Sequence, residues 1–206
     1  MFRGVNSRAR AVLRAIETTC DVTNIYGLRI YAPEALTAFA LRLRGVFPKF
    51  LGSEYTDDAK LRTEMYPIPF EDLTALSLPS DTFDLVSTNE VLEHVPRLDD
   101  SLRELCRVLR PGGWHVGTHP FMCMSLTGLV RARLVGDRIE HLTEPEYHGN
   151  PMSPEGSLVF ELPGWSVLER CRNTGFSYAA MRFIISTKYG VAANDAGGVF
   201  VLTCRK

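Results

Sequence analysis

The sequence lacks several features that would assign it to a class at once. No apolar run approaches the roughly 18 residues that a membrane span needs, and no apolar stretch of a signal peptide follows the charged residues 1–10. The nucleophile motif GxSxG and the phosphate-binding motifs GxxxxGKS and GxxxxGKT are also missing. We therefore expect a cytoplasmic protein with no membrane partner and predict neither hydrolase nor P-loop chemistry.

Net charge is almost absent, at −1 for 206 residues. A dedicated nucleic-acid binder would usually be basic, so we expect no nucleic-acid partner. The charge is unevenly distributed, however, at +5 over residues 1–50, −9 over 51–100 and +3 over 101–206. The acidic residues of the middle block are spaced among apolar ones, which indicates a folded acidic face. That face is either solvated surface or a site for a cationic or hydroxyl-rich ligand.

Paired cysteines are missing as well. The five cysteines are scattered, odd in number and form no CxxC pair, which supports neither a disulfide framework nor a zinc cluster. We expect reduced thiols that mostly serve as small buried hydrophobes. They are Cys20, Cys106, Cys123, Cys171 and Cys204.

The residues that are present indicate one globular domain. The chain is 45% hydrophobic and 23% charged, close to the globular average, and its length suits a single domain over 1–206. Apolar periodicity predicts a helix over 7–18, within an N-terminal region 1–26 and capped by Asn6 or Ser7, and a second helix over 36–43. Strands are predicted at 28–32, 47–53, 83–87 and 114–118. This alternation of strands and helices predicts a parallel sheet.

The best-marked helix is predicted over 101–110. Ser101 and Glu104 have the spacing of a capping box, and Pro111-Gly112-Gly113 would end the helix. The charge-rich segment 54–64 is expected to be a loop. Beyond residue 120 we expect a helix within 121–135, a lid or substrate loop over 121–160, a helix over 165–172, and closing strands at 176–186 and 199–203.

Four sequence elements follow one another between residues 71 and 113. They are Asp72-Leu73-Thr74, then DTFDLV at 81–86, NEVLEHV at 89–95, and LRPGG at 109–113. This stretch resembles the class I S-adenosylmethionine-dependent methyltransferases of the type 11 kind. The resemblance implies an α/β fold, a Rossmann-like doubly wound sheet of about seven strands with a reversed C-terminal hairpin. It also implies S-adenosyl-L-methionine as the cofactor.

Candidate cofactor-binding residues follow the predicted strands, because ligands of open α/β sheets lie beyond the carboxyl ends of the strands. Glu54 follows the second strand, and one carboxylate can accept hydrogen bonds from two ribose hydroxyls. The resemblance implies that Asp72 accepts from the adenine amino group, that the Leu73 N–H donates to the ring, and that Asn89 belongs to the same site. Asp72 alternatively caps a turn or helix.

The glycine-rich turn of the family, acidic-x-Gly-x-Gly after the first strand, is missing. Glycines there let the backbone approach the cofactor, whereas residues 30–37 read IYAPEALT. We expect Glu34 to be the retained acidic residue that contacts the cofactor's ammonium group, and Thr37 to offer a hydroxyl or cap the next helix. The alternative is a catalytically silent methyltransferase-like protein that binds or regulates a partner.

Three histidines are candidate catalytic residues: His94, His119 and His148. Methyl transfer from a sulfonium is an in-line displacement, in which a base assists when the acceptor is a hydroxyl. Histidine suits that role because its ordinary pKa is about 6.5. His94 and its neighbour Glu93 could instead brace the turn that they occupy.

No metal site is predicted. The segment 141–148 reads HLTEPEYH, which lacks the HExxH spacing, and Pro145 disfavours a continuous helix there. We expect methyl transfer to a small-molecule acceptor, more readily at oxygen or nitrogen than at carbon, because the chain shows no added binding domain or basic face. The predicted assembly is a monomer or homodimer. A nucleotide- or sugar-nucleotide-modifying enzyme on the same sheet is a further alternative.

Overall fold

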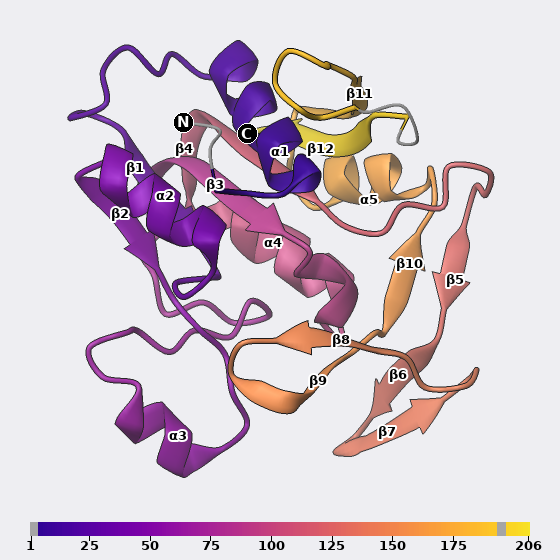
Figure 1. Cartoon of the computed structure of the whole chain (residues 1–206). Helices are drawn as coiled ribbons and strands as arrows, with labels where there is room; N and C mark the ends of the chain where they lie inside the picture. Colours follow the sequence, from indigo (N-terminus) through magenta and orange to yellow (C-terminus); the bar gives the residue numbers. More distant parts are fainter. Residues whose placement is uncertain (1–3, 193–196) are drawn as a thin grey trace.

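The computed structural model describes residues 4–192 and 197–206, which form a three-layer α/β/α arrangement around one six-stranded sheet (Figure 1). The strand order is β11-β12-β4-β3-β1-β2. The strands are β1 (Arg29–Ala32), β2 (Lys49–Gly52), β3 (Phe83–Asn89), β4 (Leu109–Thr118), β11 (Tyr178–Ile184) and β12 (Val199–Arg205). β1 to β4 are parallel, while β12 is antiparallel to both β4 and β11. The predicted α/β class and the reversed C-terminal hairpin are confirmed, whereas the sheet of the described residues has six strands and not the predicted seven or so.

Beyond β2, the six-stranded sheet is extended only by one isolated parallel β-bridge among the described residues. Glu54, just after β2, pairs in parallel with Phe70 through the bonds Glu54 N–H to Pro69 and Glu71 N–H to Glu54. Pro67 and Pro69 lack the N–H groups that would lengthen this pairing.

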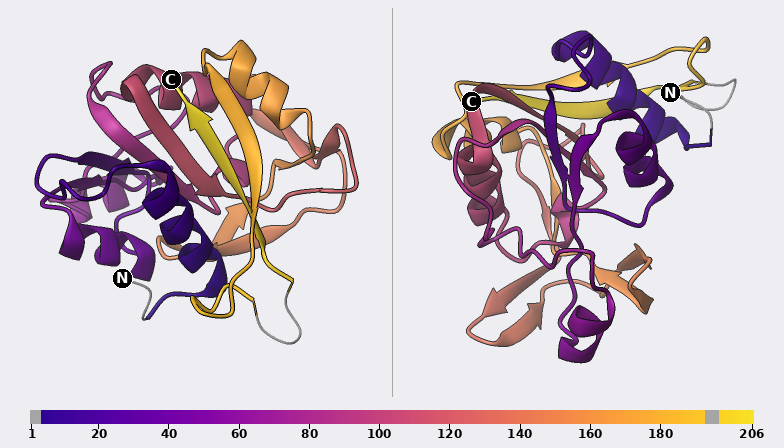
Figure 2. Two further views of the ribbon diagram at one scale, coloured as in Figure 1. Left: turned by 90° about the horizontal axis from the view of Figure 1, so that it is seen from above. Right: turned by 90° about the vertical axis from the view of Figure 1, so that its left-hand side faces the viewer.

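Helices cover both faces of the sheet. These helices are α1 (Ser7–Thr19), α2 (Ala38–Val46), α4 (Leu98–Val108) and α5 (Val167–Asn173), whereas the short α3 (Ala59–Glu64) buries no residue and lies apart from the sheet (Figure 1). One apolar cluster joins α1 and α2 to the sheet, and the other joins α4 and α5 to its opposite face. Figure 2 shows α4 on one side of the sheet, with α1 and α2 on the other. None of these helices is both long and apolar enough to cross a bilayer.

The starts of the helices agree with two predictions and differ from two others. Asn6 caps α1 and Thr37 caps α2, each accepting from a backbone N–H. The predicted capping box is wrong, because α4 begins three residues earlier and Ser101 is buried inside it. The predicted loop after β2 contains α3, which Asp58 caps through the N–H groups of its first turn.

The helix predicted within 121–135 does not form. Residues 128–163 instead make three small antiparallel sheets. Their strands are β5 (Gly128–Val130), β6 (Ala132–Val135), β7 (Arg138–His141), β8 (Tyr147–Asn150), β9 (Ser153–Leu158) and β10 (Glu161–Pro163), paired as β5–β10, β6–β7 and β8–β9. Gly128 has a φ of +80°, and a Cβ there would lie 2.3 Å from the Leu162 carbonyl oxygen. Distant strand pairing thus overrides the local pattern.

All five cysteines are free thiols. Cys106, Cys171 and Cys204 are buried, in agreement with their predicted packing role, whereas Cys123 is exposed.

Candidate functional site

The strand order reverses between β1 and β3. From β1 the chain proceeds to β2 on one side, and β3 and β4 then fill the other side. In open α/β sheets a crevice forms at such a switch, outside the carboxyl ends of the strands. Glu34 follows β1, Glu54 follows β2, and Asn89 and Glu90 lie at the end of β3. The topology therefore brings these predicted site residues to one edge of the sheet.

Glu34 is a buried carboxyl group at this switch point. Its side chain accepts a hydrogen bond from the Thr37 hydroxyl at Oε2, while Oε1 is buried without a partner among the described residues. Burial raises the pKa of Glu34 to about 8, although the Thr37 hydrogen bond opposes the shift and the carboxylates of Glu54 and Glu90 reinforce it. Desolvation disfavours the charged form of a carboxyl, so this group gains most from a cationic ligand.

Glu54 organises the loop that lacks glycine. Its Oε1 accepts hydrogen bonds from the backbone N–H groups of Ala35, at 2.8 Å, and Leu36, at 3.0 Å. None of residues 33–37 has a positive φ, so the loop conformation itself requires no glycine. One carboxylate oxygen of Glu54 thus holds the loop, and Oε2 can still accept from a hydroxyl.

A glycine that permits close approach lies on the neighbouring strand. A Cβ on Gly52, the last residue of β2, would lie 2.8 Å from the Glu34 carbonyl oxygen and 3.1 Å from the Ala35 Cα. Side chains at this position would push the loop away, so Gly52 allows the loop and β2 to pack together.

Glu90 has an uncommon backbone conformation beside the same edge. Its φ is +58°, in the left-handed region that non-glycine residues seldom adopt. Its Oε2 lies 3.0 Å from Nη1 of Arg8 in α1, and its Oε1 is buried and unpartnered within the described structure. Such outliers cluster at functional sites, where the surrounding structure compensates the strain.

The remaining predicted cofactor-binding residues are Asn89, the last residue of β3, and Asp72 and Leu73, which follow the Glu54–Phe70 bridge. The Oδ1 of Asn89 accepts from the Thr118 hydroxyl at 2.7 Å, which joins the ends of β3 and β4. The Oδ1 of Asp72 accepts from both the N–H and the hydroxyl of Thr74, so Asp72 stabilises a turn. The Leu73 side chain is buried in the core cluster beneath α4.

His119 immediately follows β4 and is buried. Neither ring nitrogen has a hydrogen-bond partner among the described residues, and the ring meets Phe121 edge-on at 6.2 Å between centroids. Burial lowers the pKa of His119 to about 4, so the imidazole is neutral near pH 7 and can accept a proton.

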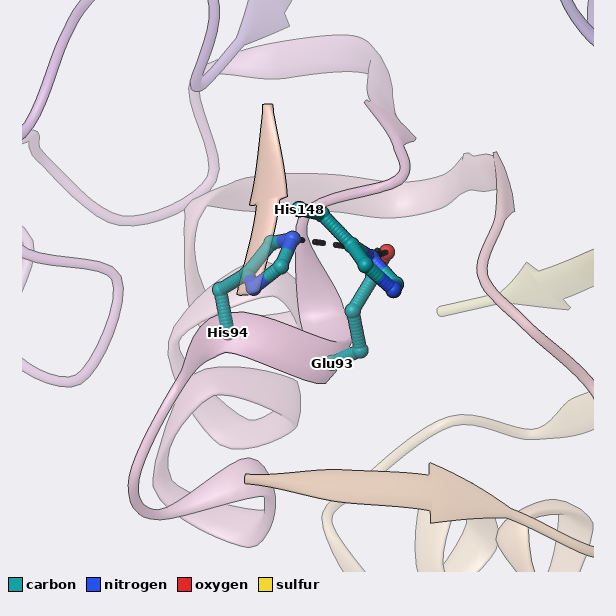
Figure 3. A group of neighbouring side chains, drawn as sticks. All are labelled: Glu93, His94 and His148. Atoms are coloured by element: carbon teal, nitrogen blue, oxygen red, sulfur yellow. Dashed lines mark ion pairs between the residues drawn. The ribbon is translucent and has the colours of Figure 1, made fainter. Parts of the chain in front are cut away.

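The other two predicted catalytic histidines lie together. His94 belongs to the short 3₁₀ helix η1 (Leu92–His94), His148 belongs to β8, and their rings meet edge-on at 5.2 Å. Glu93 lies between them and is fully buried, with both carboxylate oxygens lacking hydrogen-bond partners in the described chain (Figure 3). Burial raises the pKa of Glu93 to about 8, and Glu90 adds to the shift.

From the sequence, Glu90 was a candidate because it follows the predicted strand together with Asn89 and His94, whereas Glu93 was expected only to brace the turn. Their spacing at 90, 93 and 94 could have flagged two carboxylates and an imidazole on one turn. The contact with His148, 54 residues from His94, had no signal in the sequence. Two hydrogen bonds bring the end of β9 to η1. The His94 ring bonds to the Leu158 carbonyl, and the Phe160 N–H donates to the backbone carbonyl of Glu93.

Comparisons with known proteins match this part of the chain. The methyltransferase domain family matches residues 51–117, from β2 into β4. A curated relative, the ubiquinone/menaquinone biosynthesis C-methyltransferase UbiE of Laribacter hongkongensis, is 43% identical over 47 residues, or 23% of this chain. That match spans only 19% of the relative's length.

Solved structures extend the likeness to the whole fold. An S-adenosylmethionine-dependent methyltransferase from Mesorhizobium loti superposes with a TM-score of 0.60 at 17% identity, covering 100% of both chains. The 1,6-didemethyltoxoflavin-N1-methyltransferase of Burkholderia thailandensis, solved with its substrate and S-adenosylhomocysteine, superposes with a TM-score of 0.50 at 15% identity, covering 96% of this chain and 76% of that one. At these identities the structures show a shared fold. The resemblance to methyltransferases is confirmed by the family match over residues 51–117 and by the shared fold of S-adenosylmethionine-dependent methyltransferases.

Proposed function

We propose that this protein transfers a methyl group from S-adenosyl-L-methionine to a small-molecule acceptor, at oxygen or nitrogen. The observation that carries the proposal is the meeting of Glu34, Glu54 and Glu90 at the carboxyl ends of β1, β2 and β3. Burial is the main cause of the raised pKa of Glu34, and the nearby carboxylates of Glu54 and Glu90 add to it. A site of this charge suits a ligand that is positively charged at both its ammonium and its sulfonium groups.

The residues present fit that cofactor. The unpartnered oxygens Glu34 Oε1 and Glu90 Oε1 can accept from a cationic ammonium group, which would also relieve their mutual repulsion. Glu54 holds the loop with one oxygen and offers the other to ribose hydroxyls. When bound, S-adenosylmethionine supplies an electrophilic methyl group on a positively charged sulfur.

The acceptor class rests on His119 and on the size of the hairpin region. Burial lowers the pKa of His119 to about 4, so its ring is neutral near pH 7, and its two unpartnered nitrogens can bind the hydroxyl or amine of an acceptor. We propose that the hairpins of residues 128–163 serve as the lid. Their short strands of three to six residues suit enclosure of a small molecule.

Calorimetry with S-adenosylmethionine and S-adenosylhomocysteine tests the cofactor. Glu54→Ala should weaken binding by about tenfold or more, because it removes a charge-assisted acceptor and releases the loop. Glu64→Ala is the matched control, since Glu64 is an exposed residue of the same acidic region. Absence of binding by the wild-type chain would refute the proposal, and equal affinity for all three proteins would refute the site.

The glycine-free loop also favours a second candidate, a silent methyltransferase-like protein. Oε1 of Glu54 already bonds to the loop, so only Oε2 is left to accept from the ribose hydroxyls. A silent protein would bind S-adenosylhomocysteine yet release none of it during incubation of S-adenosylmethionine with metabolite extracts. Release of S-adenosylhomocysteine together with a methylated product would exclude this candidate.

A further inference from the structure

The cluster of Glu93, His94 and His148 is not accounted for by cofactor binding. Each residue offers one ligand atom, and these three atoms all lie within 4.8 Å of one another. The Glu93 carboxylate is fully buried, and neither oxygen has a hydrogen-bond partner in the described parts of the chain. A buried carboxylate without partners is costly unless it is paired, neutralised or bound to a metal.

Hydrogen bonds on the far sides of both imidazoles orient the free nitrogens toward Glu93. His94 Nδ1 lies 2.9 Å from the Leu158 carbonyl oxygen, so Nδ1 carries the proton and Nε2 presents its lone pair. His148 Nε2 lies 3.1 Å from Oε1 of Glu146, which leaves Nδ1 free in the same way. Metal-binding histidines typically donate their other N–H to a carbonyl or a carboxylate. The cluster has one of each.

Glu146 is itself held in place. Its second carboxylate oxygen, Oε2, lies 3.2 Å from Nη2 of Arg131, and Arg131 also donates to the Glu144 carbonyl. The carboxylate that orients His148 is therefore anchored within the hairpin region.

Two of the three separations between the free atoms are close to those between ligands of one ion, and all three atoms lie within 4.8 Å of one another. His94 Nε2 lies 3.5 Å and His148 Nδ1 lies 3.6 Å from Oε1 of Glu93, so neither contact makes a good hydrogen bond. Ligands placed about 2.1 Å from a tetrahedral ion lie about 3.4 Å from one another. Figure 3 shows the three side chains gathered around this space, with the ion pairs dashed. We propose that Glu93, His94 and His148 bind one divalent zinc-class ion.

The donor set selects the kind of ion. Two imidazole nitrogens and one carboxylate oxygen suit Zn²⁺, whereas Mg²⁺ and Ca²⁺ prefer all-oxygen ligands. Three protein ligands leave a fourth position for water or for an oxygen of another molecule. The ion would also join η1 to β8, and so would fasten the hairpin region to the end of β3.

Zn²⁺ binding to the full chain, stripped with a chelator and studied without S-adenosylmethionine, tests this inference directly. Calorimetry should show one Zn²⁺ per chain for the wild type and little response to Mg²⁺. Glu93→Gln and His148→Gln should abolish that binding, while Glu146→Gln should weaken it about tenfold to hundredfold, the usual effect of losing an outer partner. Unfolding curves for each variant establish that it is folded.

His141→Gln is the matched control, because His141 lies in the same hairpin region, is exposed and has no place in the cluster. It should bind Zn²⁺ as the wild type does. The inference is overturned if the wild type does not bind Zn²⁺ in molar excess, or if His141→Gln loses binding as fully as His148→Gln. The inference is independent of the proposed function, since Zn²⁺ and S-adenosylhomocysteine binding are measured separately and either can fail alone.

Discussion

The ionisation of Glu34 should make the free energy of unfolding depend on pH. Burial raises the pKa of this carboxyl from 4.5 to about 8 in the folded chain. Because the folded pKa is the higher one, the folded state binds the proton more tightly. The associated stability is therefore fully present below about pH 4.5 and is lost as the pH rises through 8.

The size of this effect follows from the width of that window. At pH 7 Glu34 is ionised in the unfolded chain and protonated in the folded chain. Relative to low pH, this lowers the free energy of unfolding by about 3 kcal/mol, at 1.36 kcal/mol per pH unit above 4.5. Above pH 8 the loss of free energy of unfolding levels off at about 5 kcal/mol. Glu34→Gln mimics the protonated form at every pH. The variant should therefore be more stable than the wild type, increasingly so from about pH 5 to 8.

Urea unfolding of the wild type and Glu34→Gln across this pH range measures the difference, and the exposed Glu64→Gln serves as control. In the same variant, S-adenosylhomocysteine binding should weaken, because the ammonium group loses its counter-charge. Stability and binding should thus change in opposite directions, as expected where function requires a destabilised site. A stability difference that is the same at every pH would refute the reasoning.

Two further variants test the loop and the N-terminal helix. Gly52→Ala should destabilise the chain by about 1–3 kcal/mol, because the new Cβ would lie 2.8 Å from the Glu34 carbonyl oxygen. It should also weaken S-adenosylhomocysteine binding by displacing the loop. Unchanged unfolding and binding curves would contradict the close approach of β2 and the loop. Arg8→Ala should lower the free energy of unfolding by less than about 1 kcal/mol, since Arg8 is largely exposed. Because the substitution frees Glu90 from its ion pair, S-adenosylmethionine binding measured by low-salt calorimetry should tighten several-fold. Weaker binding would show that Arg8 supports the site.

Local signals predicted the elements of the sheet and its helices well. Asn6 and Thr37 cap α1 and α2 where a polar residue precedes an apolar stripe, and the short apolar runs became β1 to β4. These patterns are reliable because caps and periodic burial depend on residues close in sequence. The start of α4 was misplaced, because Ser101 matched a capping box yet lies buried in the helix interior.

Residues 121–163 were predicted poorly for a physical reason, whereas the helix near 165–172 and the two closing strands formed as predicted. The apolar residues of 121–135 fit a helix locally, but Val130 and Leu129 pair with β10, about 30 residues away. Cross-strand pairing depends on distant partners that no local window contains. The predicted role of this region as a lid stays a prediction.

The sequence by itself determined the α/β class, the likeness to methyltransferases and the acidic residues Glu34 and Glu54, because these depend on motif order and on position after a strand. Only the tertiary structure decided which groups meet. It showed that Gly52 admits the glycine-free loop, and that β8 carries His148 to Glu93 and His94. Such contacts depend on how distant segments pack, and a one-dimensional pattern does not record that packing.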